Sequence, residues 1–570
     1  MAKKIISLLL VLSLLCNFAA CDNAEPGTTS SATIEKSPTP TPTLIPSSDQ
    51  ETPIGTGTTS RTEDSEKETV TLEAFPAEDC GFIGWASDEA GETIVSYYNP
   101  YTFNSEDEVP FYPVFIHNEQ VIEFQDAAVE AEIQQQLGTT AITYGNLQQI
   151  TTLLVSFHGE HSLSTLKDLA YFHSLKYLQI RLKAAYTYDC SPLANLINIE
   201  TLIIMDADVE GAFVEFLPIE NYKNLVYLEA TYTGKDITPF AVHANTLEQL
   251  RLYYTTLEDY SFLSKLTRLT HLQIYDGSLD DSHLQYLPNT LTWLDLRGCT
   301  NIQDISPIRN CTNLTYLQIS DASIYDITPL HNLKSIKYLI LDGNYISDLS
   351  PLSELSNLAI LEVRDNKICD MDPIMELEEL DDILWNGNPI KVYDFLEKTK
   401  ENPHSYAYRW QVSQAQEMVD SLIRPEMTQM EKYWVLAKAL CEKASVSSHE
   451  FDANIPMPSY GNQSTTIFEL PAEEEYSCFS YAETYQLLCS LAGLLCYQTS
   501  GSCIHEEVHS WNIVELDGQY YHVDVAWMDR DDTNIDKSYF LKSDSFFKSH
   551  THADWRPVEL CNDTSKDFSF

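Results

Sequence analysis

Basic residues are scarce in this chain of 570 residues. It has 34 lysines and arginines against 85 aspartates and glutamates, which gives a formal net charge of −51. Proteins bind the phosphates of nucleic acids through basic surface, so this shortage argues against a nucleic-acid partner. Glycine-rich phosphate loops are absent as well. The acidic excess is instead typical of a soluble exported protein that resists non-specific association.

Long apolar runs are also missing from most of the chain. The exception, "IISLLLVLSLL", follows Lys3 and Lys4 and is too short to span a membrane. Small residues then precede Cys21 in "NFAAC". This order resembles a bacterial lipoprotein signal, which implies that residues 1–20 are removed and that Cys21 carries a lipid. We therefore expect an extracytoplasmic protein, lipid-anchored to the cell membrane at the cell surface; an ordinary secretory signal is the alternative.

The number of cysteines is odd once the N-terminus is set aside. Of 13 cysteines, Cys16 would leave with the signal and Cys21 would carry the lipid, so 13 − 2 = 11 remain. At least one thiol could therefore be free in an export compartment. Disulfides among the others are compatible with that compartment, but the sequence does not show which cysteines would pair.

Two short regions follow the signal. Residues 21–69 are rich in Ser, Thr, Pro and Gly, as in "KSPTPTPTLIPSS", and such a composition cannot bury a core, so we expect a disordered tether. Residues 70–116 alternate aromatic and polar residues around Gly81, Gly84 and Gly91, which we take as turns of a small β module. Its "GFIGW", glycine turn and closing "YPVF" resemble the Listeria–Bacteroides repeat of internalin-type surface proteins. That resemblance implies a spacer or interaction module.

A repeat of 22 residues dominates residues 117–400. Leu317, Leu339 and Leu361 occupy one column, and the surrounding pattern L-x-x-L-x-L-x-x-N-x-I is that of a leucine-rich repeat. One unit cannot bury its apolar face alone, so we expect about ten or eleven units to stack as a solenoid of short parallel strands. The spacing, with returns such as "DISPI", resembles the internalin class. Residues 121–153 resemble the helical N-terminal cap of that class.

Two other columns of the repeats are informative. Asn344, Asn366 and Asn388 fall at the turn, where an amide side chain can bond adjacent backbones, whereas Ala322 lacks that amide. The residue before the second leucine of each repeat is expected on the concave side. The ten residues aligned there are Tyr177, Thr201, Tyr227, Gln249, His271, Trp293, Tyr316, Tyr338, Ile360 and Asp382.

Five of these ten residues are Tyr or Trp. Exposed aromatic rings supply rigid contact area, so the column predicts a docking surface for a protein, peptide or glycan. The alternative is that aromatic residues occur there only because they are common on strands. The candidate residues of the binding face are Tyr177, Tyr227, His271, Trp293, Tyr316 and Tyr338.

Residues 401–570 contain the candidate catalytic groups. The stretch "SCFSYAETYQLLCSLAG" keeps helical spacing, with Ser477 as its N-cap and Gly501 closing the segment. Cys478 then lies in the first turn, where the helix dipole and free N–H groups favour a thiolate. A buried apolar role is the ordinary alternative for a single cysteine.

Further along, a β-hairpin is predicted around Asp517-Gly518. This dipeptide is a type I′ turn signal, and "WNIVEL" and "QYYHVDVAW" flank it. A two-residue loop makes paired positions sum to 1035, which sets His509 opposite Ala526 and Trp511 opposite Asp524. His509 and Asp524 would then be diagonal neighbours on one face, roughly 7 Å apart or less. A carboxylate at that place can orient an imidazole toward a third group.

Together, "CFSYAETYQLLCSLAGL", "HSWNIVELDGQYYHVDVAW" and "YFLKSDSFFKSHTHADW" resemble the transglutaminase-like superfamily in its bacterial secreted form. The resemblance covers about residues 410–570. It implies a papain-like α+β fold in which Cys478 is the nucleophile, His509 the base and Asp524 the orienting acid. It also implies a cysteine acyltransferase, peptidase or amidase that needs no cofactor. A degenerate, non-catalytic domain in an adhesion or scaffold protein is the alternative.

The letters "HEEVH" at residues 505–509 also fit the zinc-peptidase signature H-E-x-x-H. That signature works on a helix, where both imidazoles share one face. Here Gly501 precedes the motif by four residues, and "WNIVEL" begins a strand two residues after His509. There is no room for the helix, so we expect no metal site. The sequence thus predicts a multidomain protein that combines a repeat solenoid, an α+β domain and a small β module.

Overall fold

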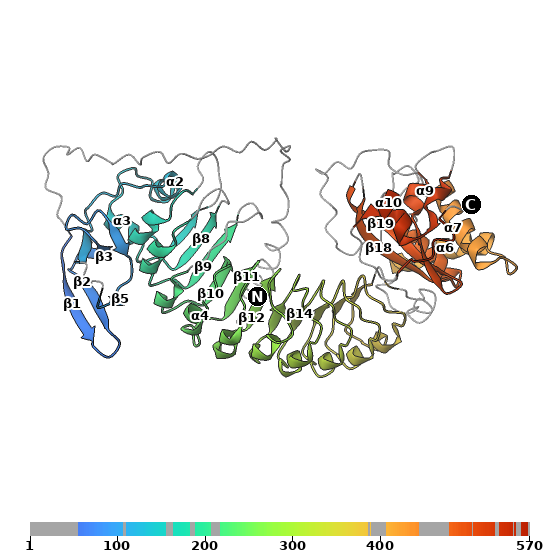
Figure 1. Ribbon diagram of the computed structural model, residues 1–570, viewed down its shortest axis with the longest axis horizontal. Coiled ribbons are helices and arrows are strands. Elements are labelled where there is room, and N and C mark those ends of the chain that lie inside the picture. The colour runs from blue at the N-terminus through green and yellow to red at the C-terminus, as the bar shows by residue number, and fades with distance from the viewer. Residues whose placement is uncertain are drawn as a thin grey trace. The chain divides into compact units, whose positions relative to one another are not determined.

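The computed structural model describes residues 55–106, 110–155, 163–182, 188–206, 217–385, 388, 406–443, 478–503, 506–529, 535–550, 552–553 and 560–567. Within these residues lie a small β module, an 11-stranded parallel sheet and an α+β domain (Figure 1). The expected signal, Cys21 and most of the expected tether fall outside the described residues. No helix in the described ranges is long and apolar enough to cross a membrane.

The N-terminal module consists of two antiparallel sheets of three strands each. Val70, Leu72, Phe82 and Trp85 form the buried core of the module. One sheet contains β1 (Gly57–Asp64), β2 (Thr69–Pro76) and β5 (Tyr101–Asn104), and the other contains β4 (Ile94–Ser96), β3 (Cys80–Ala86) and β6 (Tyr112–His117).

Two sequence-based expectations about this module were wrong in detail. Residues 57–64, which we placed in the tether, form β1 and pair along their whole length with β2, so the module begins before residue 70. Gly91 has φ 75°, as a turn requires. Gly81 and Gly84 instead lie inside β3, so neither marks a turn. A Cβ added at Gly84 would come within 2.7 Å of the Ile94 side chain, so this glycine permits close packing.

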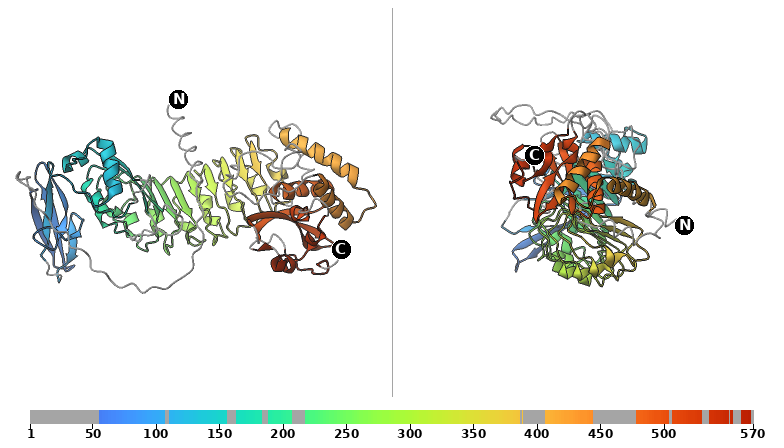
Figure 2. Two further views of the ribbon diagram at one scale, coloured as in Figure 1. Left: turned by 90° about the horizontal axis from the view of Figure 1, so that it is seen from above. Right: turned by 90° about the vertical axis from the view of Figure 1, so that its right-hand side faces the viewer.

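The repeats form one parallel sheet, which confirms the predicted solenoid. Its strands pair in sequence order and line the inner side of the arc, as Figure 1 shows and Figure 2 presents from a second direction. Leu317, Leu339 and Leu361 pair in register and are fully buried. The strands are β7 (Thr152–Val155), β8 (Tyr177–Leu182), β9 (Thr201–Asp206), β10 (Tyr227–Thr231), β11 (Gln249–Tyr253), β12 (His271–Tyr275), β13 (Trp293–Asp295), β14 (Tyr316–Gln318), β15 (Tyr338–Ile340), β16 (Ile360–Glu362) and β17 (Asp382–Leu384).

Short helical returns connect successive strands along the outer side of the arc (Figure 1). Pro329, Pro351 and Pro373 are the second residues of three of these returns, because the fixed φ of proline suits the first turn of a helix. The returns are η1 (Lys167–Tyr171), η2 (Ser191–Asn195), η3 (Ile219–Asn221), α4 (Thr238–Ala241), η4 (Ser261–Lys265), η5 (Leu284–Tyr286), η6 (Ser306–Asn310), η7 (Thr328–Leu330), η8 (Ser350–Leu352) and η9 (Asp372–Ile374). The expected helical cap precedes them as α2 (Ala127–Leu137) and α3 (Tyr144–Leu147).

The asparagine column ties neighbouring repeats together. The Asn366 amide donates to the carbonyl oxygens of Leu341, Val363 and Arg364 at 2.9–3.2 Å, and its oxygen accepts from the Ile346 N–H at 2.9 Å. Asn344 and Asn388 make the same kind of contacts one repeat to either side. Each buried amide therefore satisfies backbone groups that the turn leaves without a ladder partner.

The C-terminal part is an α+β domain. Its sheet is antiparallel, with the strand order β21-β20-β19-β18-β22. Helix α8 packs against β18 and β19, and Tyr485, Leu488 and Val514 belong to the shared core. The elements are α6 (Tyr406–Leu422), α7 (Gln429–Lys443), α8 (Cys478–Leu491), β18 (Cys496–Cys503), β19 (Glu506–Leu516), β20 (Gln519–Val523), α9 (Val525–Met528), η11 (Lys537–Tyr539), β21 (Phe540–Lys542), α10 (Asp544–His550) and β22 (His552–Ala553).

Replacing Asn366 with alanine should destabilise the repeats, because it removes four hydrogen bonds at once, three of them buried. We expect a loss of about 2–4 kcal/mol, given roughly 1 kcal/mol for each bond. Asn357→Ala is the matched control, since that exposed amide makes one bond, to the Lys334 carbonyl. Thermal unfolding followed by circular dichroism should show a clearly lower Tm for the first variant. Equal Tm values for the two variants would contradict this account.

Candidate functional site

The β19–β20 hairpin has the predicted turn and register. Asp517 and Gly518 have φ of 54° and 77°, as a type I′ turn requires. The paired positions run from Leu516↔Gln519 to Asn512↔Val523, and each pair sums to 1035. The ladder then stops, because Asp524 leaves the strand and becomes the N-cap of α9. Ala526 therefore lies in a helical turn, and the expected pairing of His509 with Ala526 was wrong.

His509 and Asp524 nevertheless meet as expected. His509 Nε2 lies 2.8 Å from Asp524 Oδ2, and both residues are at most 1% exposed. Asp524 Oδ1 accepts the Trp527 backbone N–H at 3.1 Å, which is the capping contact of α9. The turn out of the strand thus keeps the carboxylate beside His509 and also holds its second oxygen.

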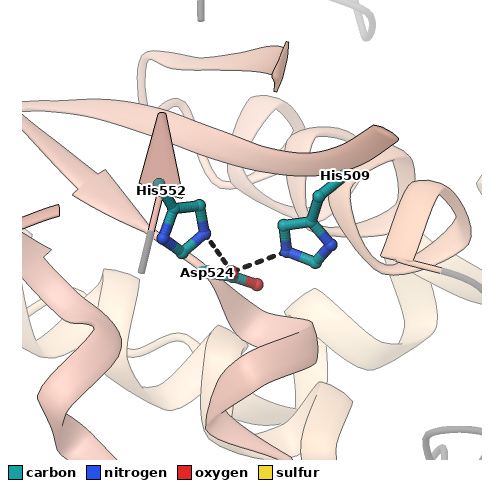
Figure 3. A group of neighbouring side chains, drawn as sticks. All are labelled: His509, Asp524 and His552. Carbon is teal, nitrogen blue, oxygen red and sulfur yellow. Dashed lines mark hydrogen bonds and ion pairs between the residues drawn. The ribbon is translucent and has the colours of Figure 1, made fainter. Parts of the chain in front are cut away.

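A third residue, His552, shares this carboxylate. Its Nε2 lies 3.0 Å from the same Oδ2 atom, and Figure 3 shows the two imidazole rings on either side of Asp524. His552 comes from β22, which pairs with β18 at the edge of the sheet. From the sequence, "SHTHAD" was interpreted as a polar loop, with metal binding as the alternative, and not as part of this pair. No local spacing could have found His552, because it follows Asp524 by 28 residues.

The charge state of Asp524 follows from these contacts. Burial alone would raise the pKa of this carboxyl, but the charge of His509 and the hydrogen bonds from His509 and His552 outweigh it. The pKa of Asp524 is therefore well below its usual range. An ionised carboxylate only accepts hydrogen bonds, so both histidines donate from Nε2. In neutral His509 the proton then lies on Nε2, and Nδ1 is the basic nitrogen.

Cys478 is the first residue of α8 and is half-buried. The expected cap, Ser477, lies outside the described residues. Asn512 of β19 donates to the Ala482 carbonyl of α8 at 2.9 Å, so the strand that contains His509 is bonded to the first turns of this helix. Helix α8 also packs against α9, whose N-cap is Asp524.

The end of α8 also differs from expectation. The helix stops at Leu491, and Gly493 adopts φ 71° just beyond it. Residues 496–503 form β18, so Gly501 lies in a strand and does not close the helix. In the C-terminal domain, Cys441, Cys478, Cys489 and Cys496 are free thiols.

A second histidine–aspartate pair braces the sheet behind the site. The Trp511 Nε1–H donates to His522 Nδ1 at 2.9 Å, and His522 Nε2 lies 2.7 Å from Asp544 Oδ1. Indole only donates, so His522 Nδ1 has no proton and the ring is neutral. Burial lowers the pKa of His522, and Asp544 opposes that shift only in part. These contacts attach α10, which begins at Asp544, to β20.

The zinc-peptidase interpretation of "HEEVH" is excluded by the secondary structure. Residues 506–509 belong to β19, so this segment is extended and not helical. His505 lies outside the described residues. Two groups of side chains could still supply metal ligands by their proximity: His509, Asp524 and His552 form one, and His522, Asp544 and Cys561 form the other.

The repeat column is the second candidate site. The ten aligned residues are the first residues of β8 to β17, and they pair in register from Tyr177 to Asp382. The rings of Trp293 and Tyr316 stack 3.6 Å apart with planes 3° apart. His271 and Tyr338 continue the row on either side at 6.1 and 6.3 Å. The structure therefore brings four of the six candidate residues into one row.

Comparison with known proteins gives partial similarities. No family model matches the chain. Kyphoscoliosis peptidase of Homo sapiens is 26% identical over 149 residues, which are 24% of this chain and 21% of that protein. Its counterpart from Mus musculus is 32% identical over 89 residues, 14% of each chain. This chain therefore spans about a fifth or less of either relative.

Among solved structures, an internalin from Listeria monocytogenes is 24% identical, with a TM-score of 0.38. The match covers 47% of this chain and 84% of that one. The leucine-rich-repeat fold of this chain rests on its own 11 parallel strands.

The neutral state of His522 predicts a pH dependence. Its folded pKa is below the ordinary value near 6.5, so the unfolded chain takes up the proton first as the pH falls. The contribution of His522 to the free energy of unfolding is therefore fully present above about pH 6.5. It declines below that pH, by up to about 1.4 kcal/mol per pH unit. Hydrogen exchange of β19 and β20 at pH 7.5 and 5.5, corrected for intrinsic rates, should show this loss. In His522→Gln the loss should shrink, and an unchanged loss would contradict the assignment.

Proposed function

We propose that the C-terminal domain is a transglutaminase-like cysteine enzyme that acts on amides of peptides or proteins. The observation that carries the proposal is the buried contact of 2.8 Å between His509 Nε2 and Asp524 Oδ2. It leaves Nδ1 as the basic nitrogen of a ring whose orientation is held. The position of Cys478 at the start of α8, which packs against β19 and α9, is consistent with a nucleophile on the same side of the domain.

The chemistry balances within one acyl-transfer cycle. His509 Nδ1 takes the thiol proton, and the Cys478 sulfur forms a bond to the amide carbonyl carbon. The Cys478 backbone N–H is the default donor to the oxyanion. The imidazolium proton then passes to the departing amine as the C–N bond breaks, which leaves a thioester. An amine or water then attacks the thioester carbonyl carbon, the C–S bond breaks, and the proton of the attacking group passes through His509 to the Cys478 sulfur. The products are a cross-link or a hydrolysed amide, and the free thiol is restored.

Alkylation of thiols in the full chain tests this proposal. Cys478 should be alkylated by iodoacetamide much faster at pH 7 than Cys369, which is an exposed cysteine in the repeats. The His509→Ala change should lower the alkylation rate of Cys478 by roughly 100-fold, as expected for loss of a general base, and should leave the alkylation rate of Cys369 unchanged. His331→Ala, which removes an exposed repeat histidine, is the matched control.

Equal rates at Cys478 and Cys369 in the wild type would favour the alternative, a degenerate domain. If Cys478 is fast, glutamine peptides incubated with and without a primary amine distinguish the two reactions. Mass spectrometry then shows either amine incorporation or hydrolysis. If the Cys478 thiol is the nucleophile, the Cys478→Ala variant should give neither product.

We further propose that the repeats bind a protein or peptide through their concave face. The supporting observation is the row His271, Trp293, Tyr316 and Tyr338. Trp293 and Tyr316 cover each other's faces, so their edges are turned outward. A sugar ring packs against an aromatic face, whereas a peptide can use ring edges and neighbouring polar groups. The Tyr316 hydroxyl donates to Gln318 on the same face, which adds such a group.

Peptide display on the full chain, run beside a glycan array, tests this second proposal. The double variant Trp293→Ala, Tyr316→Ala should bind a selected peptide roughly 30-fold or more weakly, because central aromatic residues supply most of the binding energy of an interface. Tyr325→Ala is the control, since this ring is 61% exposed and lies outside the sheet strands. Binding of glycans alone, or equal losses in both variants, would contradict the proposal.

The setting of these activities is proposed from the sequence. A lipid on Cys21 would anchor the chain to the outer face of the cell membrane, and the residues after it would separate the folded parts from that surface. The repeats would then hold a protein target while the C-terminal domain acts on an amide.

A further inference from the structure

His552 reaches the candidate catalytic pair from a separate part of the sheet. Strand β22 pairs with β18 through Cys503 and His552, and this pairing directs the imidazole inward. The His552 side chain is fully buried, as is that of Asp524, and Nε2 lies 3.0 Å from Oδ2. A buried donor this close to a buried carboxylate affects both the charge and the orientation of that carboxylate.

Aromatic rings hold the His552 ring on several sides. Phe547 stacks on it at 4.2 Å, Trp511 meets it edge to face at 4.7 Å, and Trp527 lies at 5.1 Å. Rotation of the imidazole would disturb each of these contacts, because buried rings at such distances leave little free volume. The direction of the Nε2–H is therefore fixed by the packing and not by the hydrogen bond alone.

We propose that His552 is a positioning residue for the Cys478–His509–Asp524 system. It donates to the same Oδ2 atom as His509, while the Trp527 N–H holds Oδ1. Three donors thus keep the carboxylate ionised and prevent it from turning away from His509. As a result, His509 keeps its proton on Nε2 and its lone pair on Nδ1. The inference rests on the proposed function, because it assigns His552 a role at that same site.

A zinc site made by these three residues is the competing interpretation. Two imidazole nitrogens and a carboxylate oxygen suit Zn²⁺. Ligand atoms around tetrahedral zinc, each about 2.0–2.1 Å from the metal, lie roughly 3.3 Å apart. The observed separations of 2.8 and 3.0 Å are shorter and match N–H to carboxylate hydrogen bonds. The distances therefore favour the positioning role.

The experiment compares His552→Phe, which keeps an aromatic ring but removes the donor, with His552→Gln, which keeps an N–H donor. Phe547→Leu is the control, because it alters the packing on the same imidazole without touching Asp524. Cys478 alkylation in the full chain is measured relative to Cys369. Loss of the donor should lower the alkylation rate of Cys478 about tenfold, as expected for one charge-assisted hydrogen bond. His552→Gln should recover most of that rate, and Phe547→Leu should change it less than about twofold.

A purely structural role predicts the opposite order, since phenylalanine fits an aromatic pocket better than glutamine. A rate for His552→Phe equal to or above that of His552→Gln would overturn the proposal. If His552→Phe does not fold, His552→Met serves as the non-donor in the same comparison. Stoichiometric zinc in the purified wild type, lost in both His552 variants, would also overturn the proposal in favour of a metal site.

Nitrogen NMR of histidine-labelled protein separates this inference from the proposed function. His509 should show the Nε2–H tautomer in the wild type and in His552→Gln, and a mixture of tautomers in the non-donor variant. This readout does not require a reactive Cys478. Slow alkylation of Cys478 in the wild type, together with the expected tautomer change in the non-donor variant, would therefore contradict the proposed enzyme and still support the role of His552. An unchanged tautomer in the non-donor variant would overturn the role itself.

Discussion

A polar group that folding removes from water must find its hydrogen-bond partners inside the protein, and both large parts of this chain are organised around that constraint. In the repeats, Asn344, Asn366 and Asn388 are buried, and each bonds the backbones of adjacent turns. In the C-terminal domain the buried Asp524 carboxylate is bonded by two histidines and a backbone N–H. Leaving any of these groups unpaired would cost several times what the average hydrogen bond contributes.

In the C-terminal domain, this requirement connects elements that are distant in the sequence. Strand β19 carries His509, the turn after β20 carries Asp524, and β22 carries His552. Trp511 contributes twice, because its N–H binds His522 while its ring contacts His552. The groups that would perform acyl transfer therefore belong to the network that holds the sheet and α10 together. Changes to one residue of this network are expected to affect stability and chemistry together.

In the repeats, a single register produces both the core and the candidate binding face. The pairing that aligns Leu317, Leu339 and Leu361 inside also aligns the preceding residues on the opposite side of the strands. Because the strands are adjacent and parallel, Trp293 and Tyr316 are brought within stacking distance. The same stacking that would favour peptides over sugars is thus a direct consequence of the repeat period.

The sequence by itself determined what depends on short-range periodicity and pairing. The 22-residue period predicted the stacked parallel strands and the residues that begin them. The Asp517-Gly518 dipeptide predicted the type I′ turn, the register and the contact of His509 with Asp524. Gly501 before "HEEVH" and the strand "WNIVEL" after it left no room for a helix at that motif. These features depend on residues that are separated by no more than about one repeat, so their pattern can be recognised in the sequence alone.

Only the tertiary structure decided the features that depend on long-range packing. Composition assigned residues 57–64 to a tether, but pairing with β2 makes them a strand. The strand after the turn ends at Val523, because the Asp524 carboxylate caps α9. The same carboxylate selects His552, although no spacing in the sequence relates the two residues. Such contacts arise because a buried charge takes whatever donors the fold brings to it, and the positions of those donors are set by the assembled sheet.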